Sequence, residues 1–199
     1  MNGADDHDAG LGFGGGCLPK DIRAFMARAG ELGADQALTF LREVDRINMR
    51  RRERAVDLAR EMLGGSILGR KIAVLGLAFK PDSDDVRDSP ALNVAAQLSL
   101  QGAAVMCHDP RAMDNSRVRF PELVFAESID EAIAGADAIM VLTEWTDYRE
   151  LDPVALLGRV TSPIVIDGRN CLDPDAWRDA GWRYRALGRP RQVELTFAG

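Results

Sequence analysis

The chain has 199 residues, of which 46% are hydrophobic and 28% charged, the composition of a globular protein with a core of ordinary size. Its net charge of −6 argues against a nucleic-acid-binding protein, because a basic balance is typical of that class. No apolar run approaches the roughly 18 residues that a membrane span needs, and the acidic start is unlike a signal peptide, so we expect a cytoplasmic protein with no membrane contact.

Cysteine and histidine usage indicates free thiols and no metal site. The three cysteines, Cys17, Cys107 and Cys171, are widely spaced, odd in number and without a CxxC pair. This usage is typical of a reducing compartment. The two histidines, His7 and His108, form no cluster with metal-ligand spacing. We expect Cys107 and Cys171 to be structural.

The segment GFGGGCLPKD, residues 12–21, carries the most chemistry. Its three consecutive glycines let the backbone approach a ligand closely. Cys17 precedes an expected helix start at Pro19 and lies near Lys20, and both the helix dipole and the lysine favour a thiolate. This arrangement suits a covalent nucleophile. A glycine-rich loop with an inert cysteine fits the same spacing.

After a loop over residues 1–16, two helices are predicted, from about Pro19 to Gly30 and from about Asp35 to Leu63. The second has apolar residues at helical spacing, namely Leu38, Leu41, Val44 and Ile47, and ends at Gly64-Gly65. At ~1.5 Å per residue it is roughly 40–45 Å long, more than a small domain buries. We therefore expect a connector between domains, a dimer interface, or both.

The basic run of residues 50–54, RRRER, interrupts that apolar stripe. It suits either a phosphate or nucleic-acid patch or a solvated helix face with local ion pairs. The acidic balance of the chain favours the solvated face.

Beyond residue 65 the pattern changes to alternating strands and helices. Strands are predicted at residues 71–76, 103–107, 124–125, 137–143, 163–167 and 182–187. Helices are predicted at residues 89–100 and 128–134 and after Pro153. This alternation predicts a Rossmann-like α/β fold with a mostly parallel sheet over residues 66–199, preceded by a helical segment over residues 17–65. Ligands of such sheets bind beyond the carboxyl ends of the strands.

Cationic residues follow two of these strands. The first strand leads into GLAFKPDSDDVRDSP, residues 76–90, which contains neither GxGxxG nor a Walker sequence. Lys80 and Arg87 suit a diphosphate there, or they neutralise the acidic residues of the same loop. Arg169, after the fifth strand, either faces a ligand or lies in an ordinary turn.

Taken together, four segments resemble the UDP-glucose/GDP-mannose dehydrogenase family: GFGGGCLPKD (12–21), the long helix with RINMRRRER (46–54), GLAFKPDSDDVRDSP (76–90) and IDGRN (166–170). The resemblance extends from about residue 10 to nearly the end. It implies a central dimerisation helix and a C-terminal Rossmann-like domain that binds a nucleotide sugar. It also implies that the family's N-terminal NAD-binding domain is absent, so that residues 1–16 are a loop or a remnant of it.

The resemblance also implies roles for single residues. Cys17 matches the nucleophile that carries a thiohemiacetal and then a thioester, and Asp21 matches the aspartate that helps to activate the hydrolytic water. Phe13, Gly14, Lys80 and Arg169 match residues that contact the nucleotide sugar. Lys20 and Arg87 match residues near NAD. Where the family usually has serine or a similar residue before the cysteine, this chain has Gly16.

The resemblance leads to three expectations for function. The intact enzyme would oxidise UDP-glucose to UDP-glucuronate with two NAD, as a homodimer through the long helix. The family's catalytic lysine, asparagine and glutamate, and an arginine lent by the partner subunit, lie upstream of Met1, so this chain alone is expected to be inactive. GDP-mannose is the alternative substrate, and a non-catalytic nucleotide-sugar-binding or dimerisation module is the alternative class. The acidic segment 1–7 has no obvious counterpart in the family.

Overall fold

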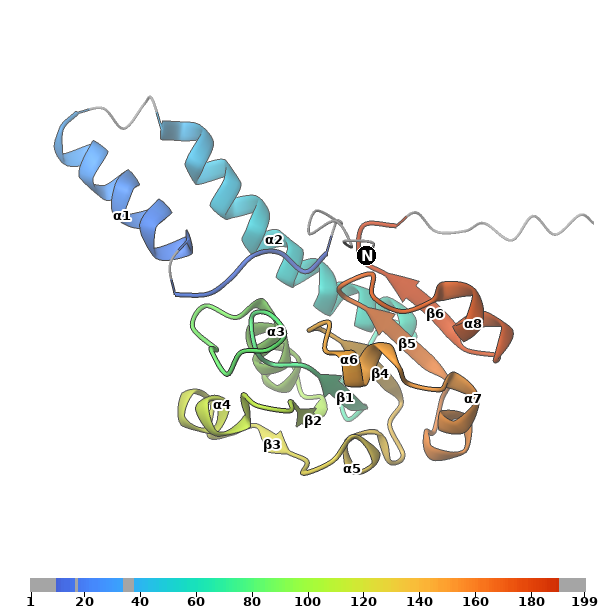
Figure 1. Cartoon of the computed structure of the whole chain (residues 1–199). Helices are drawn as coiled ribbons and strands as arrows, with labels where there is room; N and C mark the ends of the chain where they lie inside the picture. The colour runs from blue at the N-terminus through green and yellow to red at the C-terminus, as the bar shows by residue number, and fades with distance from the viewer. Residues whose placement is uncertain (1–9, 17, 34–37, 190–199) are drawn as a thin grey trace, which may run out of the picture.

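The computed structural model describes residues 10–16, 18–33 and 38–189, so Cys17 and the predicted helix start at Asp35 lie outside the described residues. A two-helix arm projects from a single sheet that carries helices on both faces (Figure 1). The sheet domain positions the candidate functional site, and the loop that precedes the first helix of the arm completes that site.

The arm consists of α1 (Leu18–Glu31) and α2 (Thr39–Met62), which confirms both predicted helices. At ~1.5 Å per residue α2 is about 36 Å long. Most of its buried residues lie in the second half, among them Ala55, Leu58 and Ala59. Gly64 and Gly65 end the helix with positive φ angles of 85° and 98°. In the described part of the chain, no helix is both long enough and apolar enough to cross a membrane.

The sheet has six strands in the order β3-β2-β1-β4-β5-β6, and all neighbouring strands are parallel. The strands are β1 (Lys71–Leu75), β2 (Ala104–His108), β3 (Val124–Phe125), β4 (Ala138–Val141), β5 (Ile164–Asp167) and β6 (Arg183–Ala186). This is the strand order of dinucleotide-binding folds. The predicted Rossmann-like class is confirmed, and the sheet is parallel throughout.

Short helices connect the strands. The predicted helices are present as α3 (Pro90–Leu100), α5 (Ile129–Ile133) and α7 (Pro153–Leu156), the last continued by a 3₁₀ turn at Leu157–Arg159. Three further helices were not predicted: α4 (Met113–Arg119), α6 (Thr146–Arg149) and α8 (Pro174–Asp179). They have seven, four and six residues, too few for a periodic apolar stripe to be recognised.

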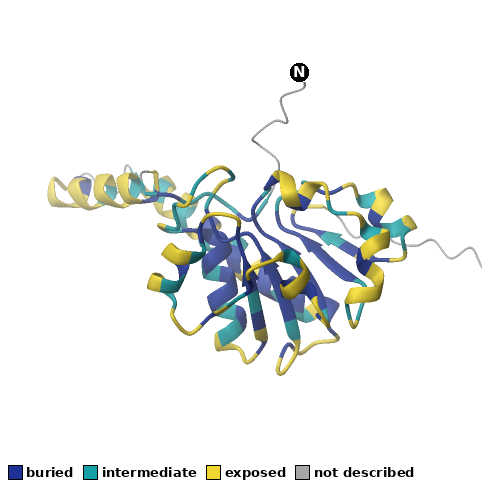
Figure 2. Cartoon of the chain, turned by 60° about the horizontal axis from the view of Figure 1, so that its bottom comes forward, coloured by how far each residue is buried: buried dark blue, intermediate teal, exposed yellow. Residues whose placement is uncertain are grey.

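Both faces of the sheet are buried, because alternate residues of each strand enter different cores. Ile72 and Val74 of β1 belong to the core beneath α2 and α3. Ala73 and Leu75 belong to the opposite core with α5, α6 and α8. Figure 2 shows the buried sheet and the mostly exposed arm. The second half of α2 is therefore an integral layer of the sheet domain, while its first half leaves that domain.

Candidate functional site

The candidate site lies at the carboxyl ends of β1 and β4. These strands are adjacent in the sheet although they are not consecutive in the chain, so the strand order reverses between them. Ligands of α/β proteins bind at such a switch point, beyond the carboxyl ends of the strands, and this region is here called the crevice. The loops after β1, β4 and β5 border it, and these contain the cationic residues that the sequence singled out.

The residues 12–16, here called the glycine loop, lie against this edge. The amide of Leu11, just before the loop, donates to the Gly168 carbonyl at 2.9 Å, and the amide of Gly15 donates to the Arg87 carbonyl at 2.9 Å. Three sequence motifs that are far apart in the chain, at residues 12–21, 76–90 and 166–170, therefore meet at one place.

Close packing explains the glycines of this loop. A Cβ on Gly14 would lie 2.5 Å from the Asp88 carbonyl oxygen, a backbone atom that cannot move aside easily. A Cβ on Gly16 would lie 2.4 Å from Cζ of Arg87, at the flexible end of a side chain. Gly14 is therefore required by packing, whereas a larger residue at position 16 only requires Arg87 to move.

The Arg169 side chain binds three backbone segments at the border of the crevice. Its Nε donates to the Leu142 carbonyl at 3.0 Å and its Nη2 to the Phe79 carbonyl at 2.9 Å. A longer contact of 3.4 Å joins Nη1 to the Gly12 carbonyl, and Glu144 forms an ion pair with Nε at 3.2 Å. The guanidinium thus links the ends of β1 and β4 to the glycine loop. Its predicted contact with a nucleotide stays a prediction.

Lys80 and Arg87 differ in how they are held. Lys80 is exposed, and its Nζ lies 5.5 Å from the centre of the Phe79 ring. Arg87 forms a two-pronged pair with Asp85, with Nε–Oδ1 and Nη2–Oδ2 distances of 2.9 and 2.7 Å. Hydrogen bonding from Arg87 lowers the pKa of Asp85. Of the two interpretations that the sequence left open, local charge neutralisation applies to Arg87, which pairs with Asp85. Lys80 keeps an exposed charge at the edge of the crevice.

The remaining predicted site residues lie on the glycine loop and the start of α1. Phe13 is partly buried within the loop. Lys20 and Asp21 occupy the first turn of α1, both exposed, with 3.6 Å between Nζ and Oδ1. Cys17 lies outside the described residues, directly between the loop and this helix in sequence.

Asp109, at the end of β2, occupies the place where a dinucleotide-binding sheet holds a phosphate. Its side chain is fully buried, and Oδ2 accepts hydrogen bonds from the amides of Leu77 and Ala78 at 2.7 and 3.0 Å. It also accepts from Trp145 Nε1 at 3.2 Å, while Oδ1 accepts from two further backbone amides. The turn after β1 thus binds an internal carboxylate, and its residues do not fit a dinucleotide.

The two described cysteines fit a structural role. Cys107 is fully buried, and burial raises its pKa to about 12. Burial also raises the pKa of Cys171. At neutral pH both thiols stay protonated and are therefore poor nucleophiles.

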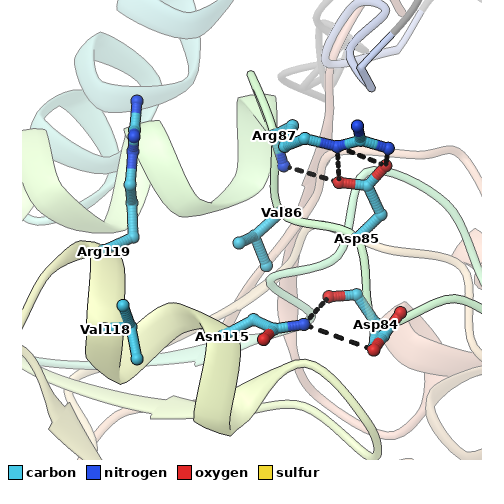
Figure 3. Close-up of a pocket in the computed structure, with 7 residues that line it drawn as sticks. All are labelled: Asp84, Asp85, Val86, Arg87, Asn115, Val118 and Arg119. Carbon is cyan, nitrogen blue, oxygen red and sulfur yellow. Dashed lines mark hydrogen bonds and ion pairs between the residues drawn. The ribbon is translucent and has the colours of Figure 1, made fainter.

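A cavity of about 660 Å³ lies beside the loop after β1, between Asp84–Arg87 and α4. Figure 3 shows Asn115 of α4 directed at Asp84, whose carbonyl accepts its amide at 2.9 Å, and Arg87 turned toward Asp85. Val86 and Val118 supply its apolar lining. Arg87 lines this cavity, whereas Lys80 and Arg169 do not, so the cavity lies beside the crevice and is not part of it.

Sequence reasoning missed two buried polar residues on α2, Asn48 and Arg52, each 2% exposed. They form part of the buried stripe that continues to Ala55 and Ala59. Two polar residues at helical spacing on such a stripe were the sequence feature that could have indicated buried polar contacts. The interpretation of the basic run as a solvated face is right for Arg50 and Arg54, which pair with Glu43 and Glu61. It is wrong for Arg52, which is buried beside Asp88 with 3.0 Å between Nη2 and Oδ1.

The fold and the site place the chain among the Rossmann-like α/β proteins. Residues 73–174 match the family model for the UDP-binding domain of the UDP-glucose/GDP-mannose dehydrogenase family, and residues 2–50 match its central domain. The chain belongs to this family. Because the second match begins at residue 2, the expectation that segment 1–7 has no counterpart in the family is wrong.

Individual relatives agree with this assignment. The chain is 38% identical to UDP-glucose 6-dehydrogenase YwqF of Bacillus subtilis (strain 168) over 93% of its length and 42% of that protein. The structure of a UDP-glucose dehydrogenase from Pyrobaculum islandicum matches 91% of the chain with a TM-score of 0.77 and 35% identity, and the chain covers 39% of it. A GDP-mannose dehydrogenase structure from Pseudomonas aeruginosa, 37% covered, matches 82% with a TM-score of 0.66 and 26% identity. The chain thus spans about two fifths of these relatives.

Proposed function

We propose that this chain is the central and C-terminal part of an NAD-dependent UDP-glucose 6-dehydrogenase, which oxidises UDP-glucose to UDP-glucuronate. The observation that carries the proposal is the meeting of the glycine loop with both cationic strand-end motifs at the switch point of the sheet. Higher identity to the two UDP-glucose dehydrogenases than to the GDP-mannose enzyme supports the choice of substrate.

In this proposal the crevice holds the nucleotide sugar. Lys80 supplies an exposed cation for the diphosphate, since a lysine provides a mobile point charge without a fixed orientation. The backbone of Phe13 and Gly14 lies against the sugar. Arg169 orders the loop carbonyls around the nucleotide and contributes positive charge from a side chain that is only 15% exposed.

Cys17 is the proposed nucleophile, since it follows the loop and directly precedes α1. Its thiolate adds to the C6 aldehyde as a thiohemiacetal, and the later thioester is hydrolysed by a water that Asp21 helps to activate. NAD supplies the oxidation chemistry when bound. The turn after β1 does not fit it, so a domain outside this chain would hold it, with Lys20 and Arg87 facing that domain. We propose that the chain alone has no turnover.

Calorimetric titration with UDP-glucose and, separately, GDP-mannose tests the proposal. UDP-glucose should bind, and Lys80→Ala should weaken binding about ten- to hundredfold, since a hydrogen bond to a charged group contributes about 1.5–3 kcal/mol. Lys71→Ala is the matched control, because Lys71 begins β1 at the opposite edge of the sheet and donates to the Ala134 carbonyl. Preference for GDP-mannose would reassign the substrate, and absence of binding by either would overturn a nucleotide-sugar site in this chain.

A further inference from the structure

Two buried polar side chains of α2 contact the glycine loop or Asp88, the residue against which the loop packs. Asn48 and Arg52 are four residues apart, on one face of the helix, and each is 2% exposed. Burying an amide or a guanidinium is unfavourable unless it is hydrogen-bonded. Their partners therefore identify what these residues do.

Asn48 binds the backbone of the glycine loop from both sides of one residue. Its Oδ1 accepts the Phe13 amide at 2.9 Å, and its Nδ2 donates to the Phe13 carbonyl at 3.0 Å. Gly12 has a φ of +106°, and a Cβ on it would lie 2.3 Å from Asn48 Oδ1. The carboxamide thus fits the loop closely, and neither a shorter nor a charged side chain reproduces both hydrogen bonds.

Arg52 supports the loop indirectly, by binding Asp88. Its Nη2 contacts the Asp88 carboxylate at 3.0 Å and the Asp88 carbonyl at 3.3 Å. Arg23 of α1 pairs with the second carboxylate oxygen at 3.0 Å. Asp88 has a positive φ of 48°, which a non-glycine residue adopts at a conformational cost. Its carbonyl oxygen is the atom against which Gly14 packs.

We propose that Asn48 and Arg52 are positioning residues that fix the glycine loop and thereby the environment of Cys17. The proposal rests on the proposed function, in which Cys17 is the nucleophile. In sequence Cys17 is the residue between this loop and α1, whose helix dipole and Lys20 favour a thiolate. Held at Phe13 from α2 and at Gly14 through Asp88, the loop has little freedom to move, and it is joined directly to Cys17 in the sequence.

The test is the pH dependence of Cys17 alkylation by iodoacetamide in the full 199-residue chain. Mass spectrometry isolates the reaction, because Cys17 is the single cysteine of tryptic peptide 1–20, in which no Lys or Arg precedes Lys20. Asn48→Ala should raise the pH midpoint of the reaction and lower its rate at pH 7 about three- to tenfold, since one pKa unit changes the thiolate fraction tenfold. Asn48→Asp, which keeps the size but loses the donor, should act in the same direction.

Gln97→Ala is the control, since Gln97 donates to Asn93 within α3 and does not touch the loop. An unchanged midpoint and rate in both Asn48 variants would overturn the positioning role. So would an equal effect of Gln97→Ala, because the effect would then be a general loss of stability. The midpoint of the unmodified chain tests the proposed function separately. An ordinary thiol value there would contradict an activated Cys17, while a rate change in the Asn48 variants would still support the positioning role.

Discussion

At the scale of single residues, the best-defined titratable group of the site region is His108, which ends β2. The Tyr148 hydroxyl donates to the His108 carbonyl at 2.9 Å, so its one hydrogen is committed. The 2.9 Å contact between the same hydroxyl and Nδ1 therefore requires Nδ1 to be the donor. Burial is the main cause that lowers the pKa of His108, and it raises that of Tyr148.

This lowered pKa predicts a stability that falls with acid. Below about pH 6.5 the unfolded chain binds a proton at residue 108 that the folded chain resists, so the unfolding free energy decreases as the pH falls. One proton contributes at most about 1.4 kcal/mol per pH unit. Urea unfolding between pH 7.5 and 5.5 should show a shallower pH dependence for His108→Gln than for the unmodified chain. Parallel curves for both proteins would contradict the prediction.

At the scale of elements, α3 shows how one capping residue joins a helix to the sheet. Ser89 Oγ accepts the Leu92 amide at 3.3 Å, as expected of an N-cap, and donates to the Leu77 carbonyl at 2.6 Å. Ser128 caps α5 in the same way, through the Glu131 amide at 3.2 Å, but near the surface. The helix start after β1 is therefore fixed both within α3 and to the loop that borders the crevice.

Ser89→Ala should lower the unfolding free energy by about 2 kcal/mol, because a cap and a buried hydrogen bond are lost and each contributes about 1 kcal/mol. Ser128→Ala should lower it by about 1 kcal/mol, because only the cap is lost. Chemical denaturation of both variants measures the difference. Equal losses would mean that the bond from Ser89 to Leu77 adds nothing.

Elements with a strong local pattern were predictable from the sequence, and contacts between distant segments were not. The β4 strand is an unbroken apolar run, and the predicted helix over residues 89–100 is present as α3. The α8 helix was missed although Asp173-Pro174 repeats the capping pattern of Asp152-Pro153 in α7, since both aspartates accept amides of the following turn. The inward orientation of Arg169 was also out of reach, because its partners come from three separate loops.

At the scale of the molecule, the arm of α1 and α2 exposes apolar side chains that the sheet domain does not cover. They are Leu18, Phe25, Leu32, Phe40, Val44 and Ile47, each at least 38% exposed. Two of them, Val44 and Ile47, belong to the stripe from which a dimer interface was predicted. We propose that a second copy of the chain covers this surface, since exposed apolar patches of this kind mark interaction sites.

Phe40→Asp should therefore shift the chain from dimer to monomer in sedimentation velocity, because it introduces a charge into the proposed interface. Val118→Asp is the matched control, since Val118 is 86% exposed but lies on α4, away from the arm. A wild-type chain that sediments as a monomer at high concentration would overturn the dimer.

Asp109 occupies two backbone amides that a phosphate at the turn after β1 would need. A free phosphate that approached the turn after β1 would compete with a carboxylate tethered in the same molecule, whose effective concentration is on the order of millimolar or higher. The amides of this turn are therefore already bound by a side chain of the same molecule. A sheet with dinucleotide-binding strand order thus has the backbone donors of its usual phosphate position already bound, which leaves the side of the switch point that the glycine loop covers for the nucleotide sugar of the proposed function.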